Sequence, residues 1–104
     1  MQESEGQFNR VLIECVNGAF EEVLGENHAK ALLYHVGREV AAARADAFAQ
    51  TLERILGLGA HVLERRALEN LYSRLGKTFQ EKKGRKFIDY VNEARVERAP
   101  IEKG

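Results

Sequence analysis

Apolar residues in this chain recur at the three- and four-residue steps of a helical face, and this period constrains the fold more than any other sequence feature. The pattern is clearest near the start, where one face collects these side chains: Phe8, Val11, Leu12, Cys15, Val16, Ala19, Phe20, Val23 and Leu24. Runs that alternate between apolar and polar residues, which mark strands, do not occur, and Pro100 is the only proline. The sequence therefore predicts an all-α fold.

The first predicted helix has recognisable start and stop signals. Ser4 and Gln7 have the spacing of a capping box, and Gly25 after the last apolar position supplies a left-handed stop. Gly18 lies inside this helix, where glycine costs about 1 kcal/mol against alanine. We expect a second helix to cross closely at Gly18.

The middle of the chain predicts two more helices. Asn27 is the expected N-cap of a second helix that runs to Val36, and Asp46 is the expected N-cap of a third. The third helix should stop at the Gly57-Leu58-Gly59 turn. Residues 38–44 are compatible with a continuing helix, a kinked helix or a connector, and their helix propensity favours the first of these.

The last third of the chain predicts a fourth helix that begins at Ala60 and stops at Gly76. Thr78 and Glu81 form a second capping-box pattern, which would open a last helix; Gly84 interrupts that segment, so the alternative start lies near Arg85. The apolar residues of this helix are Phe87, Ile88, Val91 and Ala94.

These segments together predict one compact domain of four to five short helices, bundle-like or orthogonally packed. The length of 104 residues fits a single core. We place the helical domain at residues 1–98 and a frayed tail at residues 99–104.

Composition excludes several classes of protein. Sixteen basic and sixteen acidic residues give no formal net charge, so no global field attracts a polyanion or an anionic membrane. A hydrophobic content of 44% suits a packed core and argues against intrinsic disorder. No apolar run approaches the roughly 20 residues that span a bilayer, and the first residues lack the features of a signal peptide. We therefore expect a cytoplasmic protein without a membrane segment.

Residues able to support catalysis or metal binding form no recognisable set. Cys15, the single cysteine, lies on an apolar stripe and is expected to be a buried structural thiol. His28 and His35 are two helical turns apart, about 10 Å, which is too far for one zinc ion, and His61 has no ligand at suitable spacing. A solvated face is expected to carry the acids Glu21, Glu22, Glu64 and Glu69. We predict no enzymatic activity, no metal and no cofactor.

Basic residues gather in one segment that contains the single acid Glu81. These residues are Arg74, Lys77, Lys82, Lys83, Arg85 and Lys86. Such clusters contact phosphates in nucleic-acid-binding proteins. A solvated basic turn explains the same pattern and is favoured, so a nucleic-acid-associated regulator is an alternative function.

Apolar and amphipathic residues at helix ends and flanks, among them Tyr34, Leu58 and Tyr90, favour an interaction surface. The main hypothesis is a protein-interaction or signalling module that binds a protein partner. A second copy of the chain, in a homodimer, is one such partner. A small-molecule sensor is another alternative, with its ligand near Tyr34, His35 and Cys15, and it requires an apolar cavity of roughly 300 Å³ or more.

Core and turn positions between residues 8 and 76 also carry a family resemblance. They are Val11-Leu12-Ile13-Glu14-Cys15-Val16, Leu24-Gly25, Leu33-Tyr34-His35, Phe48, Ile55-Leu56-Gly57-Leu58-Gly59-Ala60, Leu63-Glu64, Leu71-Tyr72 and Leu75-Gly76. In these residues the chain resembles the Nitrosopumilus output domain family of small archaeal helical domains. The resemblance implies an archaeal cytoplasmic domain with a signalling or regulatory output, and a break in the chain near Gly37.

Overall fold

The fold of this protein is all-α, as predicted. A computed structural model describes the backbone of residues 2–103 and the side chains of residues 6–96. This part of the chain contains no strand and forms α1 (Gln2–Leu24), α2 (Glu26–Ala41), α3 (Ala45–Leu56), the short 3-10 helix η1 (Gly57–Gly59), α4 (Ala60–Arg74) and α5 (Phe87–Lys103). None of the helices in the described residues has the length and apolarity needed to cross a bilayer.

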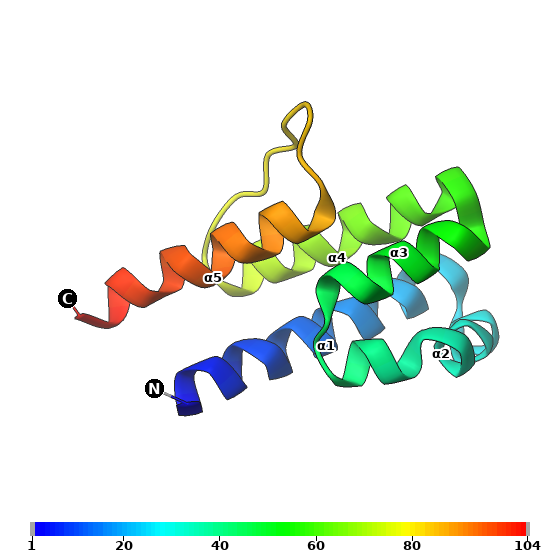
Figure 1. The fold of residues 1–104 in the computed structure, drawn as a ribbon, viewed down its shortest axis with the longest axis horizontal. Coiled ribbons are helices and arrows are strands. Elements are labelled where there is room, and N and C mark those ends of the chain that lie inside the picture. Colours follow the sequence, from blue (N-terminus) through cyan, green and yellow to red (C-terminus); the bar gives the residue numbers. More distant parts are fainter. Residues whose placement is uncertain (1, 104) are drawn as a thin grey trace.

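The helices form a compact bundle around α4 (Figure 1). α1 packs antiparallel to α4, α2 and α3 cover one side, and α5 lies against α3 and α4. α4 and α5 run in the same direction, so the segment between them returns along the length of α4. The start of α1 and the end of α5 consequently lie at one end of the bundle, and the α3–η1–α4 corner lies at the other.

The core is built from the predicted apolar stripes, except that Val23, predicted on the stripe of the first helix, is 41% exposed. The largest fully buried side chains of the core come from all five α-helices: Phe8, Val16 and Phe20 of α1, Val36 of α2, Leu52 of α3, Leu63 and Leu71 of α4, and Val91 of α5. The rings of Phe48 and Phe87 meet edge to face at 5.1 Å and join α3 to α5. Cys15 is buried, as predicted.

The glycine stops were predicted correctly. Gly25 has a φ of 84°, which ends α1, and its N–H donates to the carbonyl of Glu21 at 2.9 Å. Gly76, with a φ of 75°, follows the end of α4 in the same way. The fourth helix begins at Ala60, as expected.

The predicted caps of the first three helices were wrong. α1 begins at Gln2, so Ser4 lies within the helix and not at its cap; its side chain lies outside the described residues. α2 begins at Glu26, immediately after Gly25, and α3 begins at Ala45, so neither Asn27 nor Asp46 is an N-cap. The backbone turn at the preceding residue starts both helices without a capping side chain.

The capping box predicted at Thr78 was also wrong, because the last helix begins only at Phe87. Asp89 makes the cap instead, since its carboxylate accepts the N–H of Lys86 at 2.9 Å, as a third-position acid does in a capping box. The alternative start near Arg85 was therefore closer. α5 runs on to Lys103 and includes most of the stretch 99–104, whose side chains lie outside the described residues.

The ambiguous stretch after Gly37 is mostly helical. α2 continues through Gly37 to Ala41, and the buried side chain of Val40 holds this last turn against the core. The chain then turns at Ala43, whose φ is 56°. The break near Gly37 that the family resemblance implied does not occur.

α4 crosses α1 at Gly18, as expected, but the approach leaves room for a side chain. A Cβ atom built at Gly18 would lie 3.9 Å from Nδ2 of Asn70, which is an ordinary van der Waals contact. The packing therefore does not require glycine at this position.

Two glycine substitutions should change stability in opposite directions. Gly18→Ala should raise the free energy of unfolding by about 1 kcal/mol, because alanine is the better helix former and its methyl group fits. Gly25→Ala should lower it by about 1–2 kcal/mol, because alanine is strained at a φ of 84°. Denaturant unfolding of both variants tests this, and a loss of stability in Gly18→Ala would show that the α1–α4 contact is tighter than described.

Candidate functional site

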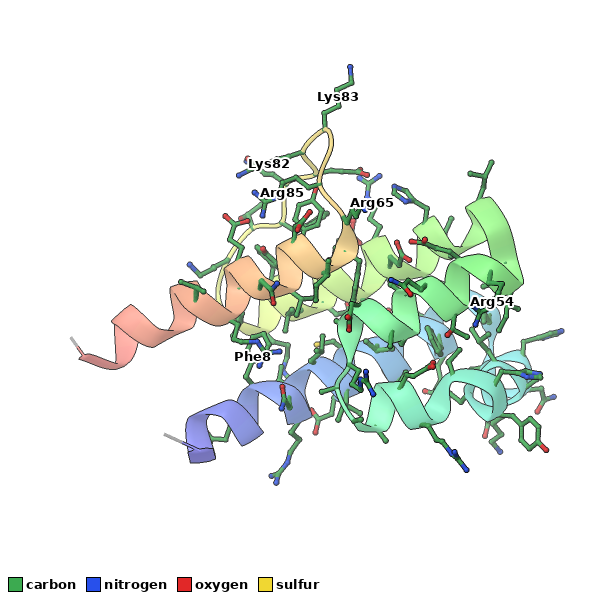
Figure 2. The ribbon with its side chains drawn as sticks, in the orientation of Figure 1. Phe8, Arg54, Arg65, Lys82, Lys83 and Arg85 are labelled. Atoms are coloured by element: carbon green, nitrogen blue, oxygen red, sulfur yellow. The ribbon has the colours of Figure 1, made fainter. Side chains whose placement is uncertain are left out.

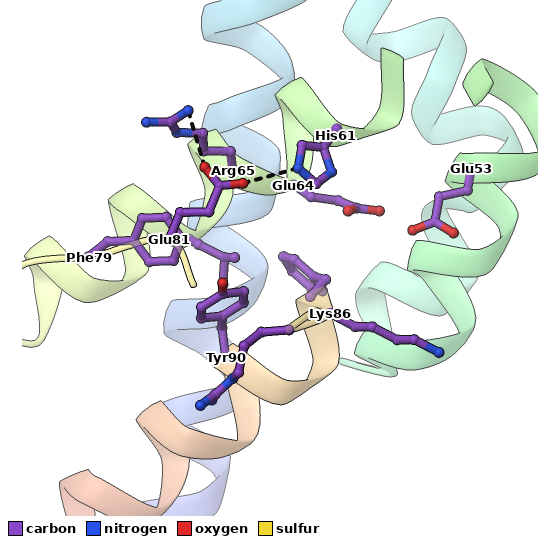
Figure 3. Close-up of a pocket in the computed structure, with 11 residues that line it drawn as sticks. Glu53, His61, Glu64, Arg65, Phe79, Glu81, Lys86 and Tyr90 are labelled. Atoms are coloured by element: carbon purple, nitrogen blue, oxygen red, sulfur yellow. Dashed lines mark hydrogen bonds and ion pairs between the residues drawn. The ribbon is translucent and has the colours of Figure 1, made fainter. Parts of the chain in front are cut away.

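A pocket of about 150 Å³ lies where α3, α4 and α5 meet the segment that returns from α4 to α5 (Figure 3). Charged side chains surround it: Glu53, His61, Glu64, Arg65, Glu81, Arg85 and Lys86. Apolar and aromatic side chains form the rest of its wall: Leu68, Phe79, Phe87 and Tyr90. Paired charges beside aromatic rings make this pocket the strongest candidate site in the described residues.

Glu64 is the unusual residue in this pocket. It was expected on a solvated face, which was wrong, because its side chain is only 5% exposed. Ala60, Leu68 and Tyr72 are buried at four-residue steps on the same stripe of α4, so Glu64 occupies a core position. Its atom Oε2 is buried and has no hydrogen-bond partner.

The second carboxyl group of the pocket comes from α3. Figure 3 shows Glu64 pointing from α4 toward Glu53. Burial, followed by the hydrogen bond and the charge of Glu53, raises the pKa of Glu64 from 4.5 to about 8. Glu64 is therefore mostly protonated and neutral at pH 7.

The return segment is anchored to α5 by Tyr90. Its hydroxyl accepts the backbone N–H of Lys82 at 2.7 Å and donates to the carbonyl of the same residue at 2.9 Å. The ring of Phe79 lies between the rings of Tyr72 and Tyr90, at centroid distances of 5.5 and 5.1 Å. These contacts give the pocket a fixed wall although the segment has no regular secondary structure.

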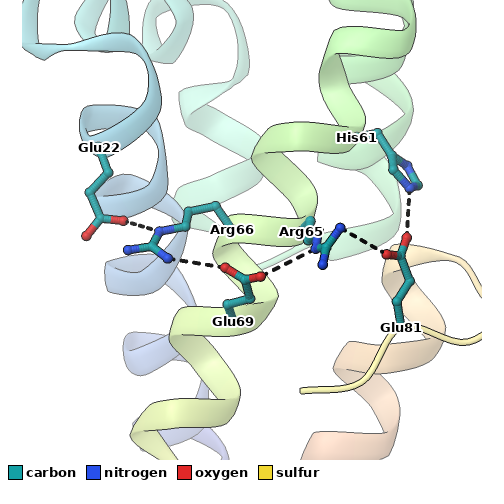
Figure 4. A network of polar contacts seen from close by, with 6 residues as sticks. All are labelled: Glu22, His61, Arg65, Arg66, Glu69 and Glu81. Atoms are coloured by element: carbon teal, nitrogen blue, oxygen red, sulfur yellow. Dashed lines mark hydrogen bonds and ion pairs between the residues drawn. The ribbon is translucent and has the colours of Figure 1, made fainter. Parts of the chain in front are cut away.

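The other acid of the pocket, Glu81, is already neutralised (Figure 4). One of its oxygens contacts His61 at 3.1 Å and the other contacts Arg65 at 3.3 Å. Arg65 also pairs with Glu69 at 3.4 Å, as the four-residue spacing allows. The network therefore uses two of the basic groups that line the pocket.

The same network continues to α1. Glu69 also binds Arg66 at 3.2 Å, and Arg66 reaches Glu22 on α1 at 2.7 Å. The hydrogen bonds from Arg66 and Asn70 lower the pKa of Glu22. The network thus links the return segment to α1 across α4, through pairs that are individually weak because they are exposed.

The six basic residues of the segment 74–86 do not form a single free surface. Arg74 pairs with Glu14 at 3.0 Å, and Arg85 pairs with Glu93 at 2.6 Å and lies over the ring of Tyr90. Lys82 and Lys83 project from the tip of the return segment (Figure 2), and Lys86 is also exposed, whereas Lys77 is half-buried.

The residues proposed for a ligand near α2 are not brought together. Tyr34 is 87% exposed and its ring meets that of His35 edge to face, whereas Cys15 is buried on α1. Burial also raises the pKa of the Cys15 thiol, which disfavours a reactive thiolate. Tyr90, expected at a flank, is buried in the wall of the pocket described above.

Exposed aliphatic side chains gather at the α3–η1–α4 end of the bundle. Leu58 in η1 is 94% exposed, and the end of α3 exposes Ile55 and Leu56. Arg66 of α4 pairs with Glu22 near the end of α1. Val62 lies one turn before Arg66 and Val23 follows Glu22, so the pair places these two valines at the same end of the bundle. We call these five residues the aliphatic end.

Within the described residues, no three His, Cys, Asp or Glu side chains are placed to hold a metal ion. No protein-family model, curated protein or solved structure matches this chain. The site must therefore be interpreted from its own chemistry.

Sequence reasoning missed the two acids that define the pocket. A signal for Glu64 existed, since its neighbours at four-residue steps, Ala60, Leu68 and Tyr72, are all apolar or aromatic. Glu53 carries no comparable signal, because only the tertiary packing of α3 on α4 brings it to Glu64. Tyr90 was noted for its amphipathic ring, but its partner Lys82 could not be read from spacing.

Glu64 should make stability depend on pH. Between pH 4.5 and about 8 the folded chain keeps a proton that the unfolded chain releases, so stability falls as pH rises. The decline is at most about 1.4 kcal/mol per pH unit. Glu64→Gln is neutral at every pH and should lose this decline, as denaturant unfolding across the range would measure.

Glu69→Gln is the matched control for this experiment, because Glu69 lies on the same helix but is only half-buried and is ion-paired. It should keep the decline of the wild-type chain. Equal slopes in Glu64→Gln and the wild-type chain would show that Glu64 is not the titrating group.

Proposed function

We propose that this protein is a regulatory interaction module, not an enzyme, that associates with a second copy of itself through the aliphatic end. The observation that carries the proposal is Leu58, a large aliphatic side chain that is 94% exposed at the tip of the bundle. An exposed apolar cluster of this kind on a small domain is typical of a protein-contact surface. The resemblance to a family named for signalling output supports the same reading, and a cytoplasmic, archaeal setting belongs to the proposal.

The composition of the aliphatic end favours a second copy as its occupant. The cluster consists of valine, leucine and isoleucine side chains, and the Arg66–Glu22 pair beside Val62 and Val23 is already satisfied within the chain. A two-fold contact sets this surface against itself, so the aliphatic side chains of each copy cover those of the other. The contact therefore buries no unpaired Arg66 or Glu22 side chain from either copy.

The other two hypotheses have less support. For nucleic acid, Arg74 and Arg85 of the basic segment are engaged in ion pairs, which weakens the cluster as a phosphate-binding surface. For a small-molecule sensor, Cys15 does not meet Tyr34 and His35, and the pocket at Glu64 is smaller than the roughly 300 Å³ typical of drug-sized ligands.

Light scattering after size-exclusion chromatography tests self-association. The wild-type chain should give about twice the monomer mass of 11.7 kDa at high concentration. Leu58→Glu should give the monomer mass, because two like charges would face each other in the contact. The variant should fold normally, since Leu58 contributes little to the core.

Val96→Glu is the matched control, because Val96 is 67% exposed but lies on α5, away from the aliphatic end. It should remain dimeric. A wild-type monomer at every concentration would overturn the proposal. A complex with a random DNA duplex that disappears at high salt would instead favour the nucleic-acid reading.

A further inference from the structure

We propose that the pocket between α3, α4 and α5 binds a small organic ammonium ion, which pairs with Glu53 and Glu64 and packs against the aromatic wall. This site is separate from the aliphatic end and does not depend on self-association.

The first argument is the unpartnered carboxyl oxygen. Glu64 lines the pocket and is only 5% exposed. Its carboxyl atom Oε2 has no hydrogen-bond partner. A buried polar atom normally has a partner, because leaving it unsatisfied is costly. An ammonium group supplies N–H donors to Oε2 and a positive charge to the two carboxyl groups at once.

The second argument is that most basic groups of the pocket are already engaged. His61 and Arg65 bind Glu81, and Arg85 binds Glu93. Glu53 and Glu64 have no ion-pair partner within the described residues. When Glu64 is ionised, the two carboxylates of Glu53 and Glu64 face one amine, that of Lys86, which is unpaired among the described residues, so the unmatched charge of the pocket is then negative and favours a cation over an anion.

The third argument concerns the kind of cation. A hard divalent metal requires six or more oxygen ligands, and the described residues offer no group of three acidic or histidine side chains for it. Aromatic faces, in contrast, attract organic cations and pack against their apolar parts. Phe79 and Phe87 line the pocket, and Tyr90 already makes one such contact, because Arg85 lies over its ring.

The size of the pocket limits the ligand. Its volume of about 150 Å³ is roughly five times the ~30 Å³ that one water molecule occupies in the liquid. The pocket therefore admits an ammonium group with a short alkyl body, and it does not admit a nucleotide.

Lys86 is the internal competitor of such a ligand. It lines the pocket beside Glu53 and has no ion pair within the described residues. Figure 3 shows its amine extending along the α3 side of the pocket. Removing this amine should therefore strengthen, and not weaken, the binding of an external ammonium ion.

A nuclear magnetic resonance titration with n-propylammonium chloride tests the proposal. The amide signals of residues 61–65 and 86–90 should shift, whereas sodium chloride and 1-propanol at the same concentration should leave them unchanged. Glu64→Gln should weaken binding at least about ten-fold, since it removes one charge and one acceptor. Glu69→Gln should bind as the wild-type chain does, and Lys86→Ala should bind more tightly.

The proton that Glu64 holds gives a second measurement. An ammonium ion binds the ionised carboxylate, so binding at pH 7 should release about one proton, which calorimetry in two buffers can count. Affinity should rise about ten-fold between pH 7 and pH 9. The other charged groups that face Glu64 are Glu53 from α3, His61 and Arg65 from α4, and Glu81, Arg85 and Lys86 from the return segment.

His61→Gln removes the imidazole of this set, and it should keep the rise in affinity. Proton release in the wild-type chain supports the proposal even if Glu64→Gln does not fold. Equal shifts with sodium chloride, unaltered binding by a folded Glu64→Gln, or binding without proton release would overturn the proposal. None of these results depends on whether the aliphatic end forms a dimer.

Discussion

The antiparallel packing of α1 on α4 is the constraint on which the rest of the structure depends. Arg66 and Arg74 pair with Glu22 and Glu14 of α1, so the neighbouring Leu63 and Ala67 of α4 face that helix. This contact occupies one side of α4 and leaves a second buried stripe for α3 and α5. Apolar burial supplies most of the stabilisation, because the ion pairs along the seam are exposed and worth little individually.

The direction of α5 follows from how this second stripe is covered. α5 runs parallel to α4, so the chain must return between them, and it does so through a segment without regular secondary structure. Tyr90 fixes this segment by bonding both backbone groups of Lys82, and Phe79 packs between two tyrosine rings. The pocket exists because a polar return segment, and not another helix, covers the end of α4 that carries Glu64.

The fold could be predicted from the sequence where local periodicity decides the structure. The apolar stripe of α1, the stop at Gly25 and the start of α4 at Ala60 were all read correctly, because each depends on residues within a turn or two. The helix caps were less predictable, since Asn27 and Asp46 are good capping residues but backbone turns before them start the helices. The pocket was not predictable, because Glu53, Glu64 and Tyr90 meet their partners only through the packing of separate helices.

The energetic balance of the charges explains why Glu64 stands apart from the other acids. Glu22, Glu69 and Glu81 remain at the surface and share their charge with arginines, so each contributes to solubility at little cost. Glu64 occupies a core position where an apolar residue of similar size would avoid the desolvation of a carboxyl group. In the rest of the bundle, apolar side chains fill the core and most charged side chains face solvent. Glu64 departs from this pattern, and such departures are expected at functional sites. The position of Glu64, whose buried Oε2 has no hydrogen-bond partner, beside a second carboxyl group and aromatic rings is therefore more informative about function than the exposed charges of the segment 74–86.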